Sequence, residues 1–214
     1  MTLQTELAAV TEHVRRQAPA AFAAIEASNT ALAATGLPQR ALRSGQTMPD
    51  FELPDATGKI VRSADLRARG PLVISFYRGH WCPYCNLELR ALQQHLPEIA
   101  RRSATLVAIS PQTPDQSLTT REKHELAFPV LSDQGNRVAR QFGLVFTLDD
   151  VIKPVLSGFG VDLSAYNGDR SDELPVPATY VVAKSGVVID ASVDVDFRNR
   201  IAPETVLAWL DRAR

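Results

Sequence analysis

This sequence of 214 residues contains only two cysteines, Cys82 and Cys85, and they stand three positions apart. Two cysteines are too few for the disulfide framework that staples a small secreted domain. The chain is long enough to bury a hydrophobic core without such staples. In a reducing compartment, a close cysteine pair is typical of catalytic, redox-sensing or metal-binding chemistry rather than of a structural bridge.

An excess of charge of one sign is also missing. The 23 Lys and Arg residues face 24 Asp and Glu residues, so the formal net charge is −1 and there is no bulk attraction to nucleic acid or anionic membranes. No apolar run approaches the roughly 18 residues of a membrane-spanning helix. The start, MTLQTELAAV, lacks the basic and then apolar stretches of a secretory signal. We therefore expect a cytoplasmic protein with no nucleic-acid or membrane partner.

Glycine is absent from the first 35 residues, which are rich in alanine. Apolar residues recur there at helical spacing on both sides of Pro19, namely at Leu3, Leu7, Val10, Val14, Phe22, Ile25 and Leu32. This pattern predicts two helices and an N-terminal helical extension over residues 1–42. Three arrangements remain open for it: docking on the main domain, a contact within a homodimer, or a loose arm.

Residues 43–214 alternate between strand and helix patterns. The apolar runs Leu72–Tyr77 and Thr105–Ser110 are typical of strands covered on both faces, and residues 82–102 between them have helical texture. Strands near 179–182 and 187–195 form a final hairpin before a helix that begins at Pro203. The order predicts an α/β domain whose central sheet is parallel in the middle and antiparallel at one edge. Residues 144–175 resist assignment, apart from a short helix near 151–156, and form a candidate substrate-facing insertion.

The two cysteines stand in the sequence Trp81-Cys82-Pro83-Tyr84-Cys85, after a buried strand and at the start of a helix. Residues three apart share one face of a helix, so the sulfurs can approach bonding distance. Unpaired N–H groups at the helix start stabilise a thiolate. A redox dithiol is the favoured interpretation, ahead of a zinc site and of inert core cysteines. Zinc would need two further ligands, and neither His80 nor His95 completes a common ligand spacing, so we expect no metal and no cofactor.

The segment Phe76–Cys85 resembles the active-site segment of the thioredoxin superfamily, and the chain from about residue 43 is similar to the peroxiredoxin-like group of the AhpC/TSA family. Three further segments carry the resemblance: residues 45–53, residues 128–143 and residues 176–182. The resemblance implies a thioredoxin-like fold, with a mixed central sheet flanked by helices, following the N-terminal extension.

Two alignments of the cysteines follow from this resemblance. Aligned with peroxiredoxins, Cys85 takes the position of the peroxide-attacking cysteine, while the family's Pro, Thr and Arg positions hold Arg78, Cys82 and Pro177. Aligned with thioredoxins, Cys82 is the nucleophile and Cys85 resolves the intermediate. Pro177 is then the cis-proline beside the disulfide, and the buried acid of thioredoxin falls on Phe76.

Three residues around the cysteines are candidates for supporting roles. Arg78 either stabilises a thiolate or forms a surface ion pair. His80 is either a proton acceptor or cationic neighbour of Cys82, or an exposed loop residue. Trp81 is expected to form a packing and docking surface beside the site.

We therefore predict a thiol-based antioxidant oxidoreductase that reduces hydroperoxides through a Cys82/Cys85 dithiol–disulfide cycle. The alternative is a thioredoxin-like protein-disulfide reductase, and a redox sensor or binding module is less favoured. An external thiol or dithiol reductant of the thioredoxin or glutathione type would regenerate the enzyme in either catalytic case.

Overall fold

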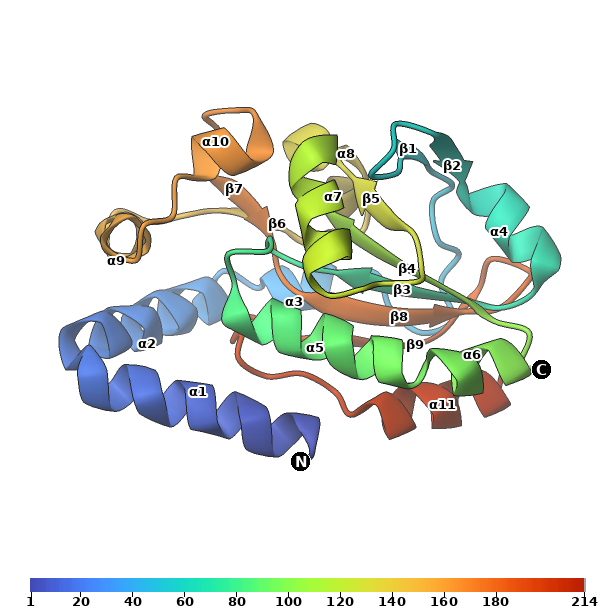
Figure 1. The fold of residues 1–214 in the computed structure, drawn as a ribbon, viewed down its shortest axis with the longest axis horizontal. Coiled ribbons are helices and arrows are strands. Elements are labelled where there is room, and N and C mark those ends of the chain that lie inside the picture. Colours follow the sequence, from blue (N-terminus) through green and yellow to red (C-terminus); the bar gives the residue numbers. More distant parts are fainter. Residues whose placement is uncertain (214) are drawn as a thin grey trace.

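The central sheet forms where the sequence has its near-continuous apolar runs. The computed structural model, which describes residues 1–213, has a five-stranded sheet in the order β5-β4-β3-β8-β9 (Figure 1). The strands are β3 (Leu72–Phe76), β4 (Thr105–Ser110), β5 (Val130–Ser132), β8 (Ala178–Val182) and β9 (Val188–Val193). β3, β4 and β5 run parallel to one another, and β8 and β9 add an antiparallel edge. The predicted mixed sheet is therefore confirmed.

Helices cover both faces of this sheet because the strand side chains alternate between the faces. Val73 points into a cluster with α5 (Pro83–Gln94) and α11 (Pro203–Asp211). Ile74 points into a second cluster, with α4 (Ser63–Arg69) and α8 (Arg137–Gln141). Around the sheet also lie β1 (Glu52–Pro54), β2 (Ile60–Arg62), α6 (Leu96–Arg101), α7 (Pro114–Lys123) and η1 (Gln134–Asn136).

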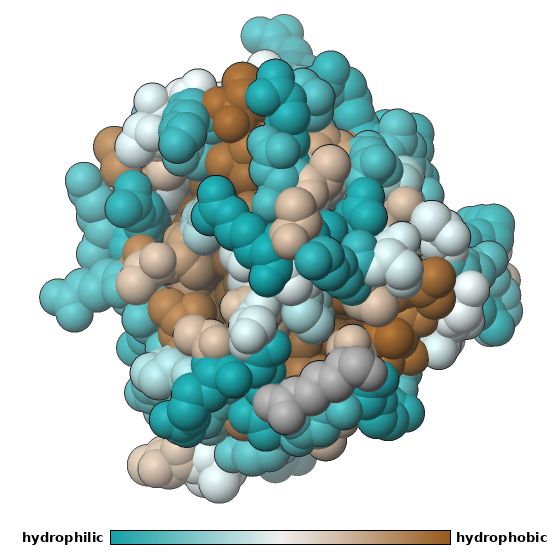
Figure 2. Space-filling view, turned by 90° about the vertical axis from the view of Figure 1, so that its right-hand side faces the viewer, coloured by the Kyte–Doolittle hydropathy of each residue, from teal (hydrophilic) through white to brown (hydrophobic). Residues whose placement is uncertain are grey.

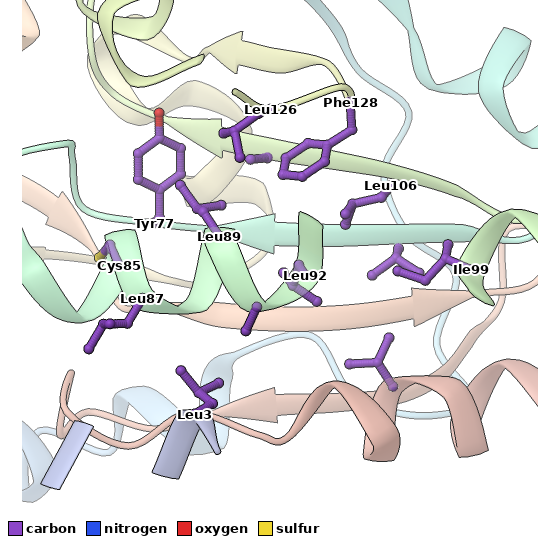
Figure 3. Close-up of a cluster of buried hydrophobic side chains, with 14 of the residues drawn as sticks. Leu3, Tyr77, Cys85, Leu87, Leu89, Leu92, Ile99, Leu106, Leu126 and Phe128 are labelled. Atoms are coloured by element: carbon purple, nitrogen blue, oxygen red, sulfur yellow. The ribbon is translucent and has the colours of Figure 1, made fainter. Parts of the chain in front are cut away.

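The first cluster fixes the position of the helix that carries the cysteines. Figure 3 shows Leu89 and Leu92 of α5 on the side of the helix that faces the sheet, with Tyr77 and Cys85 at one end of the cluster. The helical pattern predicted over residues 82–102 is interrupted at His95, where α6 begins with Pro97 in its first turn. A shorter, firmly packed α5 therefore positions the cysteine pair.

The N-terminal helices pack on the rest of the chain. α1 (Leu3–Gln17) buries Leu3 and Leu7 in the cluster of α5, and α2 (Pro19–Ala34) buries Ile25 against α9 (Ile152–Gly158). A four-residue helix, α3 (Leu37–Arg40), follows. The docked arrangement is thus the observed one and the loose arm is wrong, whereas a homodimer stays a prediction.

The segment that resisted assignment contains a small hairpin and two helices. β6 (Val145–Thr147) pairs antiparallel with β7 (Glu173–Pro175), and α9 and α10 (Leu163–Asn167) lie between these strands. The short helix expected near 151–156 is confirmed as α9. The pairing brings α9 beside α2, at the end of the molecule where α5 begins (Figure 1).

The opposite end of the molecule, turned toward the viewer in Figure 2, is mostly hydrophilic, with hydrophobic side chains in separate small patches. Across residues 1–213, no helix has both the length and the apolar character needed to traverse a bilayer. Large apolar side chains are gathered mainly in the clusters around the sheet and between α2 and α9.

Candidate active site

A tight loop connects the end of β3 to the start of α5, where the cysteine pair lies. Gly79 has a φ of 154°, and a Cβ atom there would lie 2.4 Å from Nε1 of Trp81 and 2.7 Å from Oε1 of Gln112. The Cys82 N–H donates to the Gly79 carbonyl at 3.1 Å, and Pro83 occupies the first turn of α5. A side chain at position 79 would therefore push away the side chains of Trp81 and Gln112, which pack beside the loop that leads to Cys82.

The two sulfurs form a buried, hydrogen-bonded pair without a disulfide, with Cys82 1% and Cys85 0% exposed. Burial raises the pKa of Cys82, but a hydrogen bond from the Cys85 thiol and the cations Arg78 and Arg200 outweigh it and lower the pKa to about 6. Burial and the neighbouring Cys82 sulfur raise the pKa of Cys85 well above its usual value. Cys82 is therefore the thiolate at neutral pH, and Cys85 holds its proton.

Arg78 is a buried cation, with only 3% of its surface exposed. Its guanidinium lies 4.0 Å from the ring centre of Phe197 and 4.7 Å from that of Trp81. Its Nε atom has no hydrogen-bond partner, and within residues 1–213 no carboxylate forms an ion pair with it. The surface ion pair considered for Arg78 is therefore wrong, and the thiolate of Cys82 is the anion that faces this cation.

A second buried guanidinium, that of Arg200, contacts the sulfur of Cys85. Nη2 of Arg200 donates to Sγ of Cys85 at 3.5 Å, and its Nε lies 2.8 Å from Oε2 of Glu88. Oε1 of Glu88 accepts a hydrogen bond from Thr179 of β8 at 3.0 Å. These contacts, from Thr179 through Glu88 and Arg200 to Cys85, thus link the cysteine helix to the sheet and to the segment before α11.

The charges of this site balance only when one cysteine is ionised. Arg78 and Arg200 supply two positive charges, and Glu88 supplies one negative charge. An uncompensated buried charge is costly, so the environment favours a second anion. The Cys82 thiolate supplies it, which is consistent with its lowered pKa.

Cys82, and not Cys85, also lines a pocket of about 250 Å³. Both cysteines belong to the core cluster around α5, and Cys85 lies one turn further along the helix, at one end of that cluster (Figure 3). A small molecule in the pocket would therefore contact Cys82 before Cys85.

The other predicted supporting residues lie around this pair. The ring of His80 packs edge-on against Tyr166, with 4.9 Å between ring centres, and burial lowers its pKa. A neutral imidazole near pH 7 argues against the cationic-neighbour role. Trp81 is half-buried under the Arg78 guanidinium, as expected of a packing surface.

Pro177 lies beside the site but not in the expected conformation. It shares a small cavity with Arg78 and Phe197. No peptide bond within residues 1–213 is cis, so the predicted cis-proline is wrong. The Val176 N–H donates to the Leu144 carbonyl at 2.8 Å and β8 begins at Ala178, so the chain passes Pro177 in extended form, which a trans bond allows.

Three residues of the site, Glu88, Arg200 and Phe197, were not among the predicted site residues. Glu88 carried a weak signal, since it stands three residues after Cys85 and so shares its helix face. Arg200 and Phe197 stand in an irregular segment between β9 and α11 and carried none. In the part of the chain that the structure describes, no group of three His, Cys, Asp or Glu side chains is arranged to hold a metal ion.

The buried ion pair between Glu88 and Arg200 is expected to stabilise the folded protein. Glu88→Gln keeps the shape of the side chain but leaves Arg200 buried without a carboxylate, so we expect the free energy of unfolding to fall by about 3 to 5 kcal/mol. Glu52→Gln is the control, because it breaks an exposed ion pair with Arg62 and should cost less than about 1 kcal/mol. Urea unfolding measures both, and equal losses would contradict the buried pair's role.

Comparison with known proteins places these residues in context. Residues 44–191 match the AhpC/TSA family. A Mycobacterium tuberculosis protein provisionally named a peroxiredoxin is 34% identical over 114 residues, which are 53% of this chain and 74% of the relative. Chloroplastic peroxiredoxin Q of Triticum aestivum is 27% identical over 192 residues, covering 90% of this chain and 76% of the relative.

Among solved structures, the crystal structure of peroxidoxin BcpB from Mycobacterium tuberculosis is similar to this chain with a TM-score of 0.64 and 26% identity. The similarity covers 81% of this chain and 99% of that chain. The predicted thioredoxin-like fold is confirmed. Both cysteines lie inside the family-matched range, whereas Arg200 and the first two helices lie outside it.

Proposed function

This chain belongs to the AhpC/TSA family, and from that premise we propose that it is a thiol peroxidase that reduces hydroperoxides through a Cys82/Cys85 dithiol–disulfide cycle. One observation carries the assignment of roles: Cys82 has the lowered pKa and lines the pocket, while Cys85 lies behind it and holds its proton. We therefore assign the first attack to Cys82 and the resolving step to Cys85.

In the first step the Cys82 thiolate attacks the terminal oxygen of the hydroperoxide. The S–O bond forms as the O–O bond breaks, which gives a Cys82 sulfenic acid and an alkoxide or hydroxide. The leaving oxygen takes the proton that Cys85 holds beside it and departs as an alcohol or as water. The sulfur is oxidised by two electrons, and the peroxide is reduced by two.

In the second step the Cys85 thiolate attacks the sulfur of the sulfenic acid. The Cys82–Cys85 disulfide forms and hydroxide leaves, to be protonated to water. Arg200, which contacts Sγ of Cys85, favours the thiolate needed for this step. An external thiol or dithiol of the thioredoxin or glutathione type then reduces the disulfide and supplies the two electrons of the next cycle.

Family membership supports the peroxidase over the protein-disulfide reductase. Many of its relatives are named peroxiredoxins. The family match over residues 44–191 includes both cysteines. The Pro, Thr and Arg expected around a peroxidatic cysteine are replaced here by Arg78, Cys82 and Pro177. The positive charge of the family's Arg is missing at Pro177, and the buried cations Arg78 and Arg200 supply positive charge beside Cys82 instead.

Oxidation of the reduced wild-type protein by hydrogen peroxide tests this function. We expect the thiols to react at least about tenfold faster than those of the urea-unfolded protein, because a much larger fraction of Cys82 than of an unfolded cysteine is thiolate near neutral pH. Intact-mass measurement should show the loss of two hydrogen atoms as the disulfide forms. Equal rates for folded and unfolded protein, with hydrogen peroxide and an organic hydroperoxide alike, would contradict the proposal.

A further inference from the structure

An irregular segment, residues 194–200, lies between β9 and α11 and contacts the cysteine site. From this segment Arg200 contacts the sulfur of Cys85, and the ring centre of Phe197 lies 4.0 Å from the guanidinium of Arg78. The segment lies outside the family-matched residues 44–191. It therefore supplies the site with two side chains that the family match does not include.

The guanidinium of Arg78 is held by aromatic rings. The ring centres of Phe197 and Trp81 lie 4.0 Å and 4.7 Å from its central carbon, inside the roughly 6 Å over which the face of a ring attracts a cation. This attraction is stronger when the cation is removed from water, and Arg78 is buried. Because an arginine side chain has many rotamers, the rings determine where the charge lies. Phe197 is the nearer of the two rings.

Phe197 is itself fixed in place by its neighbours. Its ring packs edge-on against Tyr84 of α5, with 5.6 Å between ring centres, and the hydroxyl of Tyr84 bonds that of Thr11 of α1 at 3.2 Å. The next residue in the chain, Arg198, forms an ion pair with Glu26 of α2. The ring therefore has a firm position from which it can hold the guanidinium.

The position of this guanidinium matters because it faces Cys82. The charged and titratable groups that act on the Cys82 sulfur are Arg78 from the loop, Arg200 from the segment before α11, and Cys85 and Tyr84 from α5. Both cations and the hydrogen bond from Cys85 stabilise the thiolate. Arg200 is placed by a buried carboxylate, whereas Arg78 depends on the two rings.

We propose that Phe197 is a positioning residue, whose ring holds the Arg78 guanidinium beside Cys82 and thereby keeps Cys82 reactive. This inference deepens the proposed function and rests on it for the role of Cys82. Without the ring, the guanidinium would leave the sulfur for part of the time, and the thiolate would lose part of its stabilising charge. The effect should be smaller than that of removing Arg78 itself.

Two variants that lack the ring, Phe197→Leu and Phe197→Met, test this proposal. The ultraviolet absorbance of the thiolate, followed against pH on the reduced protein, reports the ionisation of Cys82, because the raised pKa of Cys85 keeps that thiol protonated over the same range. In both variants the midpoint should rise by about 0.5 pH unit, so that the thiolate fraction at pH 6 falls about twofold. Leucine and methionine differ in shape, so equal shifts assign the effect to the ring.

Phe22→Leu is the matched control. The Phe22 ring lies 5.3 Å from the guanidinium of Arg198, a cation that pairs with carboxylates, and its loss should leave the midpoint within about 0.2 pH unit of the wild type. Phe197→Leu added to Arg78→Met should also cause no further shift, because the ring then has no cation to hold.

A midpoint within about 0.2 pH unit of the wild type in both ring-free variants would overturn the proposal. An undiminished further shift in the Arg78→Met background would overturn it as well, because the ring would then act on Cys82 by another route, such as Tyr84. Near-ultraviolet circular dichroism shows whether each variant is folded, and either ring-free variant suffices if the other is not. Since the titration contains no peroxide, it decides the role of Phe197 even if the wild type reduces no hydroperoxide.

Discussion

Cys82→Ser is expected to abolish the reaction with peroxide, whereas Cys85→Ser is expected to keep its first step. Cys82 is the sulfur with a pKa of about 6 and the one that lines the pocket, so its loss removes the nucleophile. We expect the rate of peroxide consumption to fall at least about 1,000-fold, because a serine hydroxyl is a weak nucleophile at neutral pH without a base beside it. Cys85→Ser should stop at the Cys82 sulfenic acid, since no second thiol remains to displace its oxygen.

Mass spectrometry of the two variants after one equivalent of peroxide checks this order. Cys85→Ser should gain one oxygen atom on the peptide that carries Cys82, and Cys82→Ser should remain unmodified on the same timescale. The peroxiredoxin alignment makes the opposite prediction. Rapid gain of oxygen on Cys85 in Cys82→Ser would therefore reverse the two roles while leaving the peroxidase function in place.

Much of the fold was predictable because its signals are local. Leu72–Phe76 and Thr105–Ser110 are continuous apolar runs, and each forms a strand buried on both faces. The spacing of Leu3, Leu7 and Ile25 marks the faces of α1 and α2 that pack on the chain. The position of the cysteine pair at the start of α5 follows from Pro83, which suits the first turn of a helix.

The site was predictable only in part because its charges come from distant positions. Arg200 and Cys85 are 115 positions apart, and no periodic pattern links an irregular segment near the C-terminus to a helix start. The pairing of β6 with β7 was equally hard to predict, because each strand has only three residues and helices separate the two in the sequence. Glu88 is buried because it pairs with Arg200, so its burial was as unpredictable as that partner.

Replacing Arg78 by methionine is expected to separate the activation of Cys82 from the stability of the fold. Arg78 is a cation that lowers the pKa of Cys82, and no carboxylate within residues 1–213 pairs with it. Without it the pKa rises, so less thiolate is present at neutral pH. In the wild type the rate should climb as pH rises through about 6 and level off above it. In Arg78→Met the climb should move upward by at least about one pH unit, and the rate at pH 6 should fall at least about fivefold.

The stability of the same variant gives the second half of the prediction. Methionine fills the space of Arg78 with apolar atoms, so we expect Arg78→Met to unfold at a urea concentration no lower than the wild type. Arg200→Met is the contrasting variant, because it leaves Glu88 buried without its cation and should lose about 3 to 5 kcal/mol. Rate profiles between pH 5 and pH 9, together with urea unfolding, test both variants. A midpoint that stays near pH 6 in Arg78→Met would assign the low pKa of Cys82 to the Cys85 hydrogen bond and Arg200 instead.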